Sequence, residues 1–156
     1  MGSTITTDIE KCKRLLSQGE LVAIPTETVY GLAANIFNED AVQRIFQVKG
    51  RPSFNPLIVH IHDRGQLGLL TTHVPKSAYA LAEAFWPGSL TLVLPKQDSV
   101  PMSITAGKDT VAVRMPNHPL ALELLQGLSF PIAAPSANPS TRVSPTSAAH
   151  VEHYFG

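Results

Sequence analysis

The sequence predicts an α/β fold in which helices flank a twisted, mixed β-sheet. Short apolar segments of strand length alternate along the 156 residues with segments whose apolar residues recur at helical spacing. Hydrophobic residues make up 44% of the chain and charged residues 15%, which indicates an extensive core. The 13 prolines gather at the ends of the apolar segments. Because proline is poorly tolerated in central strands, we expect a mixed sheet with proline-rich rims, formed by residues 1–156 as a single domain.

The chain is expected to begin with a helix followed by a strand. Thr7 and Glu10 match a capping box, so the helix should start there and end at Gly19. Cys12 falls on the apolar stripe of this helix, where a free cysteine behaves as a small buried hydrophobic residue. Residues 21–25, LVAIP, predict the first strand.

A second helix and strand follow. Asn38 can cap a helix that places Val42, Ile45 and Phe46 on one apolar face. The apolar run at residues 57–61, LIVHI, then predicts the next strand.

The second half of the chain continues the alternation. Residues 77–85 predict a helix that turns Tyr79, Ala82 and either Phe85 or Trp86 toward the core. The remaining expected elements are strands over 90–95 and 111–116, a helix over 118–127 after Asn117, a strand over 131–138 that runs into a turn, and a final helix over 146–155.

Polar side chains gather at the ends of the predicted strands, and nearly all of them donate hydrogen bonds. Ligands of open α/β sheets bind where strands end, and arginine in particular suits phosphate and carboxylate. Carboxylates are scarce among these residues, so we expect no metal site made by the protein alone. These polar strand-end residues are Thr26, Glu27, Thr28, Lys49, Arg51, Asn55, His60, Thr110, Arg114, Ser136, Asn138, Ser144 and Thr146.

Several of these residues also have a structural explanation. Lys49 and Gly50, with a proline following, match the end of a helix. His60 lies in an apolar strand, where a hydrogen-bonded core histidine is the alternative to a ligand-binding one. Arg114 lies within the apolar VAVRM segment and needs an anionic partner, which is either a buried Asp or Glu or the carboxylate of a ligand.

The charge and cysteine content limit the function classes. Twelve basic and twelve acidic residues cancel, which gives no global electrostatic argument for nucleic-acid binding. The single cysteine excludes an intrachain disulfide. We see no membrane span and no secretory signal, and we expect a cytoplasmic protein.

Four segments resemble the YrdC-like family, the threonylcarbamoyl-AMP synthases. They are PTETVYGLAANIFNEDAVQRIFQVKGRPSFNPLIVHI, WPGSLTLVLP, TVAVRMPNHP and PIAAPSANPSTRVSPT. The family's paired signatures, K-x-R and S-x-N, stand here as Lys49/Arg51 and Ser136/Asn138. The resemblance implies an α/β sheet with a large concave, positively lined cavity.

The resemblance also implies a reaction and its site residues. L-threonine, bicarbonate and ATP would form threonylcarbamoyl-AMP and pyrophosphate, with any Mg²⁺ carried by the phosphates, and the tRNA threonylcarbamoyl transferase machinery would use the product to modify an adenosine. Threonine would be held by Thr28, His60, Arg114 and the backbone at Ala134. ATP would be held by Lys49, Arg51, Asn55, Thr110, Ser136, Asn138 and Ser144, with Lys49 and Arg51 in the catalytic role.

Members of the family usually continue with further strands beyond the position where this sequence ends, at EHYFG. We therefore expect a C-terminally short YrdC-like domain whose cavity is open on one side. Two alternatives use the same fold. One is a module that binds double-stranded RNA or tRNA without synthase activity, and the other is a relative that handles carbamoyl phosphate or hydrolyses nucleotides.

Overall fold

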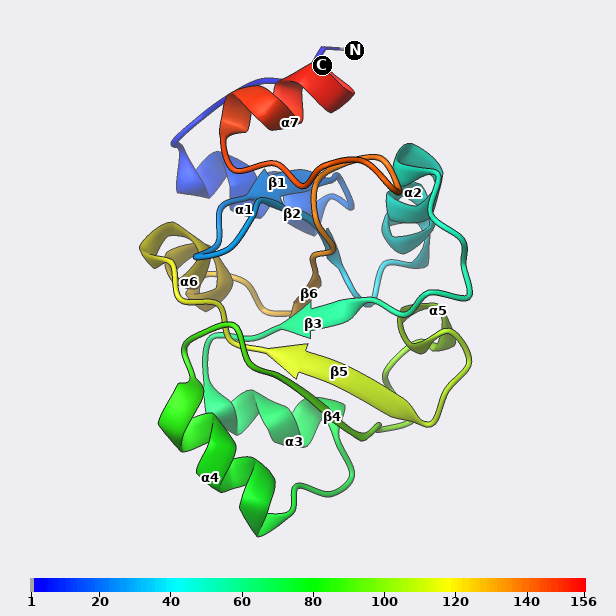
Figure 1. The fold of residues 1–156 in the computed structure, drawn as a ribbon, viewed down its shortest axis with the longest axis vertical. Coiled ribbons are helices and arrows are strands. Elements are labelled where there is room, and N and C mark those ends of the chain that lie inside the picture. The colour runs from blue at the N-terminus through cyan, green and yellow to red at the C-terminus, as the bar shows by residue number, and fades with distance from the viewer. Residues whose placement is uncertain (1) are drawn as a thin grey trace.

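A computed structural model describes residues 2–156 and shows one mixed six-stranded sheet in the order β1-β2-β6-β3-β5-β4 (Figure 1). Strands β3 and β5 are parallel, and every other neighbouring pair is antiparallel. The predicted mixed α/β fold is therefore confirmed. The strands are β1 (Val22–Ile24), β2 (Gly31–Asn35), β3 (Ile58–His60), β4 (Thr91–Pro95), β5 (Thr110–Arg114) and β6 (Ile132–Ala133).

Seven α-helices and one 3₁₀ turn surround this sheet within residues 2–156, and none of the helices is long and apolar enough to cross a bilayer. Their bounds are α1 (Ile9–Ser17), α2 (Glu39–Lys49), η1 (Arg64–Gln66), α3 (Leu67–Leu70), α4 (Lys76–Phe85), α5 (Met102–Thr105), α6 (Pro119–Gln126) and α7 (Ala148–Phe155). The sequence did not predict β2, η1, α3 or α5.

Two clusters of buried side chains hold the layers together. The larger cluster packs α2, α3, α4 and α5 against the sheet around Ile45, Val59 and Val113. The smaller cluster joins α1 and α6 to β1, β2 and β6 around Leu16 and Leu124. Figure 1 shows α3 and α4 beside β4 and β5, while α7 and α1 lie near β1 and β2, close to both ends of the chain.

Some of the local predictions are confirmed and others are wrong. The Asn38 side chain accepts from the backbone N–H of Ala41, and Gly50 ends α2 in the left-handed conformation, as predicted. The capping box at Thr7 is wrong, because Asp8 caps α1 by accepting from the Lys11 N–H. Cys12 is only half-buried at the edge of the smaller cluster.

The inward face of α4 also differs from the prediction. Trp86 and Ala82 are buried, whereas Tyr79 and Phe85 are about half exposed. The indole N–H of Trp86 donates to the carbonyl of Leu90 at 2.7 Å, which anchors the end of α4 beneath β4. Phe85 is thereby left on the solvent side.

Candidate functional site

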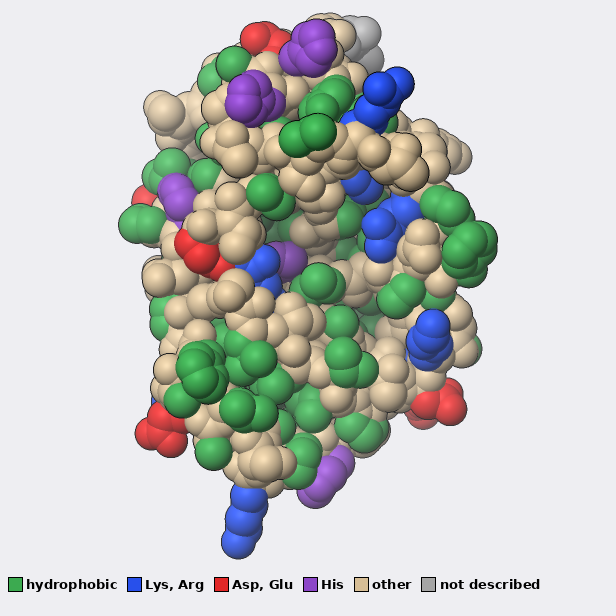
Figure 2. Space-filling view, viewed as in Figure 1, with side chains coloured by type: hydrophobic (Ala, Val, Ile, Leu, Met, Phe, Trp, Pro, Cys, Tyr) green, Lys and Arg blue, Asp and Glu red, His purple; other side chains and the backbone are tan. Residues whose placement is uncertain are grey.

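The two parallel strands place their polar side chains on one face of the sheet. His60 lies opposite Arg114 in the register of β3 and β5, and side chains two residues apart share a face. Thr110 therefore lies on the same face as Arg114, while Val111 and Val113 are buried on the other. Figure 2 shows that this side of the molecule is hollowed, with Lys and Arg side chains at the margins and a histidine within the hollow.

Arg114 is held by groups from two other segments. Its Nη2 donates to the Glu27 carboxylate and lies 3.4 Å from Thr28 Oγ1. Its Nε donates to the carbonyl of Gly88 at 3.2 Å. The Arg114 side chain is 12% exposed, and this burial lowers the pKa of the guanidinium from its usual range. The anionic partner that the sequence required is therefore a protein carboxylate in this structure. Glu27 stands among the polar strand-end residues of the sequence, but no role could be assigned to it there.

His60 is buried beside Arg114. Its Nδ1 lies 3.1 Å from the carbonyl of Ile58, and because a carbonyl can only accept, Nδ1 carries the proton. Nε2 is then the acceptor atom of the neutral ring. Burial lowers the pKa of His60 to about 4, so the ring is neutral at pH 7.

This burial predicts a loss of stability in acid. The pKa of His60 rises from about 4 in the folded protein to about 6.5 on unfolding, so the unfolded chain binds more protons between these pH values. The free energy of unfolding should therefore fall by about 2 kcal/mol from this group as the pH drops from 7 to 5. Urea unfolding of the unaltered protein and of His60→Gln at both pH values measures the difference, and an equal pH response in both proteins would contradict the prediction.

Lys49 connects the end of α2 to the turn that follows β6. Its ammonium donates to the carbonyls of Ser136 and Asn138, and its own carbonyl accepts from the Ser140 N–H at 2.7 Å. The side chain is buried, and desolvation, followed by the nearby charge of Arg51, lowers the pKa of Lys49 to about 8. The ammonium is thus still mostly protonated at pH 7. The helix-ending interpretation of Lys49 is therefore confirmed, and its ammonium also lies beside Ser136 and Asn138, two of the other predicted site residues.

Arg51 and Asn55 lie in the loop between α2 and β3. Arg51 Nη2 donates to the Pro56 carbonyl at 2.9 Å, which folds the guanidinium back over its own loop. Arg51 Nε is buried and has no hydrogen-bond partner among the residues that the structure describes. Such an atom carries a desolvation cost until a ligand or water satisfies it. Asn55 is half-buried and donates its backbone N–H to Pro52.

The segment after β6 lies against the start of β2 through main-chain contacts. Leu32 N–H donates to the Pro135 carbonyl, and Ala137 N–H donates to the Tyr30 carbonyl. A Cβ atom on Gly31 would lie 3.0 Å from the Ala134 Cβ, so glycine permits this close approach. Ser136 and Asn138 are consequently held beside Lys49.

Asn138 and Ser144 lie on either side of a surface loop. The Asn138 side-chain amide donates to the carbonyls of Pro139 and Arg142, each at 2.9 Å, while its buried Oδ1 has no partner within residues 2–156. Ser144 is half-buried, and its neighbour Pro145 accepts from the Tyr30 N–H.

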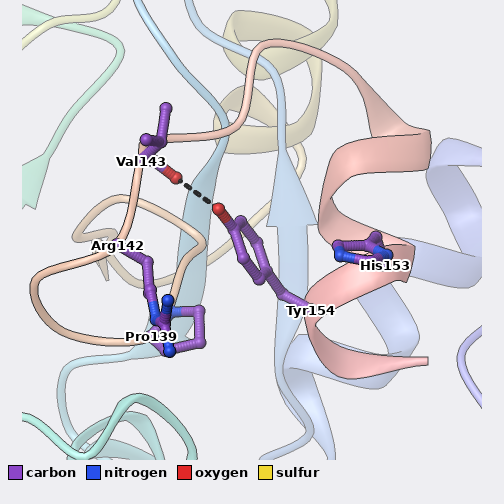
Figure 3. Close-up of a pocket in the computed structure, with 5 residues that line it drawn as sticks. All are labelled: Pro139, Arg142, Val143, His153 and Tyr154. Atoms are coloured by element: carbon purple, nitrogen blue, oxygen red, sulfur yellow. Dashed lines mark hydrogen bonds between the residues drawn. The ribbon is translucent and has the colours of Figure 1, made fainter.

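This loop and α7 line an open pocket of about 510 Å³. Figure 3 shows Tyr154 reaching from α7 to the loop, where its hydroxyl donates to the Val143 carbonyl at 3.0 Å. A smaller cavity of about 180 Å³ lies beside it and includes Ser144 in its lining. The loop residues are Pro139, Arg142 and Val143, with His153 and Tyr154 facing them from α7.

The structure brings most of the predicted site residues into two adjoining groups. One contains Lys49, Ser136 and Asn138, which are linked by hydrogen bonds, with Arg51 in the loop after α2. The other group contains Thr28, His60 and Arg114 at one end of β3 and β5. Ala134, whose N–H donates to the Ile58 carbonyl, connects the two groups. Thr110 lies at the opposite end of β5 from Arg114, about 13 Å away along the strand.

Comparisons with known proteins identify the family of the chain. A family model, Sua5/YciO/YrdC with the description "Telomere recombination", matches residues 14–156. The chain belongs to the Sua5/YciO/YrdC family. Its similarity to curated members is high, with 58% identity over 90% of the chain to a threonylcarbamoyl-AMP synthase of Pyrococcus abyssi and 56% over 97% to one of Bacillus subtilis.

Solved structures of Sua5/YciO/YrdC proteins have the same fold. The crystal structure of P. abyssi Sua5 complexed with L-threonine matches 99% of the chain at 54% identity and a TM-score of 0.93. The chain spans 46% of that structure's chain. It likewise spans 42% of the P. abyssi synthase and 44% of the B. subtilis synthase.

Proposed function

We propose that this chain carries the catalytic site of an L-threonylcarbamoyladenylate synthase, which makes threonylcarbamoyl-AMP and pyrophosphate from L-threonine, bicarbonate and ATP. The observation that carries the proposal is the near-complete match of the chain to a threonine-bound Sua5 at 54% identity. The donor-rich face of β3 and β5 supports it, because every proposed substrate is anionic or carries a carboxylate. The product would pass to the machinery that modifies a tRNA adenosine.

The threonine would lie at the end of β3 and β5. Arg114 would bind the carboxylate of the amino acid, as a guanidinium suits a planar anion. Within residues 2–156 His60 Nε2 has no hydrogen-bond partner, so it could accept a hydrogen bond from the threonine hydroxyl or amine. Thr28 Oγ1, which lies 3.4 Å from Arg114 Nη2, would also border the amino acid. The backbone at Ala134 would border the ligand.

ATP would lie along the hydrogen-bonded group around Lys49 and the segment after β6. The Arg51 Nε atom and the Asn138 Oδ1 atom, both buried and unpaired among residues 2–156, would gain partners from the nucleotide or its water. Any Mg²⁺ would be held by the phosphates, since the residues around the site offer mainly N–H and O–H groups. The ATP-binding residues would be Lys49, Arg51, Asn55, Thr110, Ser136, Asn138 and Ser144.

The proposed chemistry needs no nucleophile from the protein. The threonine amine and bicarbonate give an N-carboxylate and water, and an oxygen of this carboxylate forms a bond to the α-phosphorus of ATP. The bond from that phosphorus to the bridging oxygen breaks, and pyrophosphate leaves with the electron pair. The N-carboxylate of threonine and ATP are both anions, so the site contributes by neutralising and aligning them, and alignment is worth about 7–11 kcal/mol in favourable cases.

Pyrophosphate release tests the proposal directly. We expect the protein to release pyrophosphate from ATP in the presence of bicarbonate and L-threonine, and omission of threonine should abolish the release. Mass spectrometry of the adenylate product distinguishes threonylcarbamoyl-AMP from simple hydrolysis. Threonine-independent release, or none at all, would contradict the proposed function.

A further inference from the structure

We propose that Glu27 is a positioning residue that fixes the Arg114 guanidinium so that one edge of it is presented to the carboxylate of the amino acid. This inference rests on the proposed function, because it takes Arg114 as the receptor of that carboxylate.

The contacts of Arg114 define which edge is presented. Nε is bonded to the Gly88 carbonyl, and Nη2 is bonded to Glu27 and lies near Thr28. Within residues 2–156, Nη1 makes no hydrogen bond, so its N–H groups are the ones left for a ligand. An arginine whose Nε and Nη2 are both occupied cannot rotate its planar group without breaking these bonds.

Glu27 is itself fixed on its second oxygen. Oε2 accepts from the Asn117 N–H at 2.6 Å, while Oε1 accepts from Arg114. The loop after β1 is thereby tied to the loop after β5 through one side chain, which is 23% exposed. A carboxylate held at both oxygens is poorly placed to swing away when a ligand arrives, which favours a fixed positioning role over displacement by the ligand.

The charges support the same role. Arg114 is a 12% exposed cation, and without Glu27 its remaining hydrogen-bond partners within residues 2–156 would be the neutral Gly88 carbonyl and the Thr28 hydroxyl. A buried cation that lacks its partner is strongly destabilised, and its side chain would turn toward water. Glu27 therefore keeps the guanidinium in the hollow before threonine binds, which lowers the cost of ordering on binding.

The test is the variant Glu27→Gln, which keeps the shape of the side chain and removes its charge. We expect calorimetric binding of L-threonine to weaken by about 10- to 100-fold, the range for a charge-assisted contact. The Michaelis constant for threonine should rise in parallel, while that for ATP stays within about twofold. Glu27→Asp keeps the charge but shortens the side chain. Its affinity for threonine should lie between those of Glu27→Gln and the unaltered protein.

Glu20→Gln is the matched control, because Glu20 also pairs with an arginine, Arg44 at 3.1 Å, but within residues 2–156 its side chain makes no hydrogen bond or ion pair with a proposed ligand-binding residue. It should bind threonine like the unaltered protein. The inference is overturned if Glu27→Gln binds threonine with the affinity of the unaltered protein. Tighter binding also overturns it, because it would mean that Glu27 competes with the ligand.

A direct readout of the guanidinium separates the inference from the proposed function. The ¹H–¹⁵N resonance of Arg114 Nε–H, assigned by its loss in Arg114→Lys, should be protected from exchange in the unaltered protein and broadened in Glu27→Gln. If threonine binding and this resonance respond as expected but no pyrophosphate is released, the proposed function fails and the inference stands. If the unaltered protein does not bind threonine, the inference is overturned.

Discussion

Replacing Arg114 with glutamine is expected to reduce threonine-dependent pyrophosphate release by about 10²–10³-fold, the loss typical of removing one fixed donor from a site that stabilises charge. The guanidinium would neutralise the threonine carboxylate, and its removal leaves Glu27 as an uncompensated negative charge at the same place. Threonine binding should weaken with the activity, because the carboxylate would then meet a like charge. Steady-state pyrophosphate release and calorimetry measure the two effects.

The double variant Arg114→Gln/Glu27→Gln controls for misfolding, since it removes both charges of the pair. It should recover stability relative to Arg114→Gln, because no unpaired carboxylate remains, but it should not recover activity. Activity within about threefold of the unaltered protein in either variant would contradict the role of Arg114.

Replacing Lys49 with methionine is expected to lower both stability and activity. The buried ammonium donates to two carbonyls of the turn after β6, and each charge-assisted bond is worth about 1.5–3 kcal/mol, partly offset by the desolvation of the charge. We expect the free energy of unfolding to fall by about 2 kcal/mol and pyrophosphate release to fall by about 10²–10³-fold, because Ser136 and Asn138 lose their position. Urea unfolding and the pyrophosphate assay measure these changes.

Lys13→Met is the matched control for this variant. Lys13 also donates a charge-assisted bond, to the exposed Glu10 Oε1 at 2.6 Å on α1, but to none of the proposed ATP-binding residues. It should cost less than about 1 kcal/mol and leave activity unchanged. If Lys49→Met behaves like Lys13→Met, Lys49 does not hold the turn.

The elements that the sequence predicted correctly are those with a strong local signal. Asn38 and Gly50 bracket α2 because each satisfies backbone groups within the helix itself. Strand β2 lacked such a signal, since GLAAN contains little β-forming sequence. It becomes a strand because β1 and β6 pair with it on both sides. The four-residue helices α3 and α5 are too short to show a helical period.

In the candidate site, too, the residues with a local signal were predicted and those defined by tertiary contacts were not. Residue chemistry at the strand ends predicted an anion-binding face, and the register of His60 and Arg114 places two of those residues side by side. Glu27 could not be singled out, because its partner lies 87 residues later and nothing local distinguishes it from a solvated glutamate. The helix-ending role of Lys49 could be predicted from the residues next to it in the sequence, whereas its hydrogen bonds to Ser136 and Asn138 depend on the tertiary fold.

The segment after β6 is held against β2 by backbone atoms, through bonds such as Leu32 N–H to Pro135 and Ala137 N–H to Tyr30. Mutation of Ser136 can therefore alter the hydroxyl that this segment offers to a ligand without removing these backbone contacts. Related proteins could in this way evolve new ligand preferences at little cost in folding free energy, provided that the glycine at position 31 is retained.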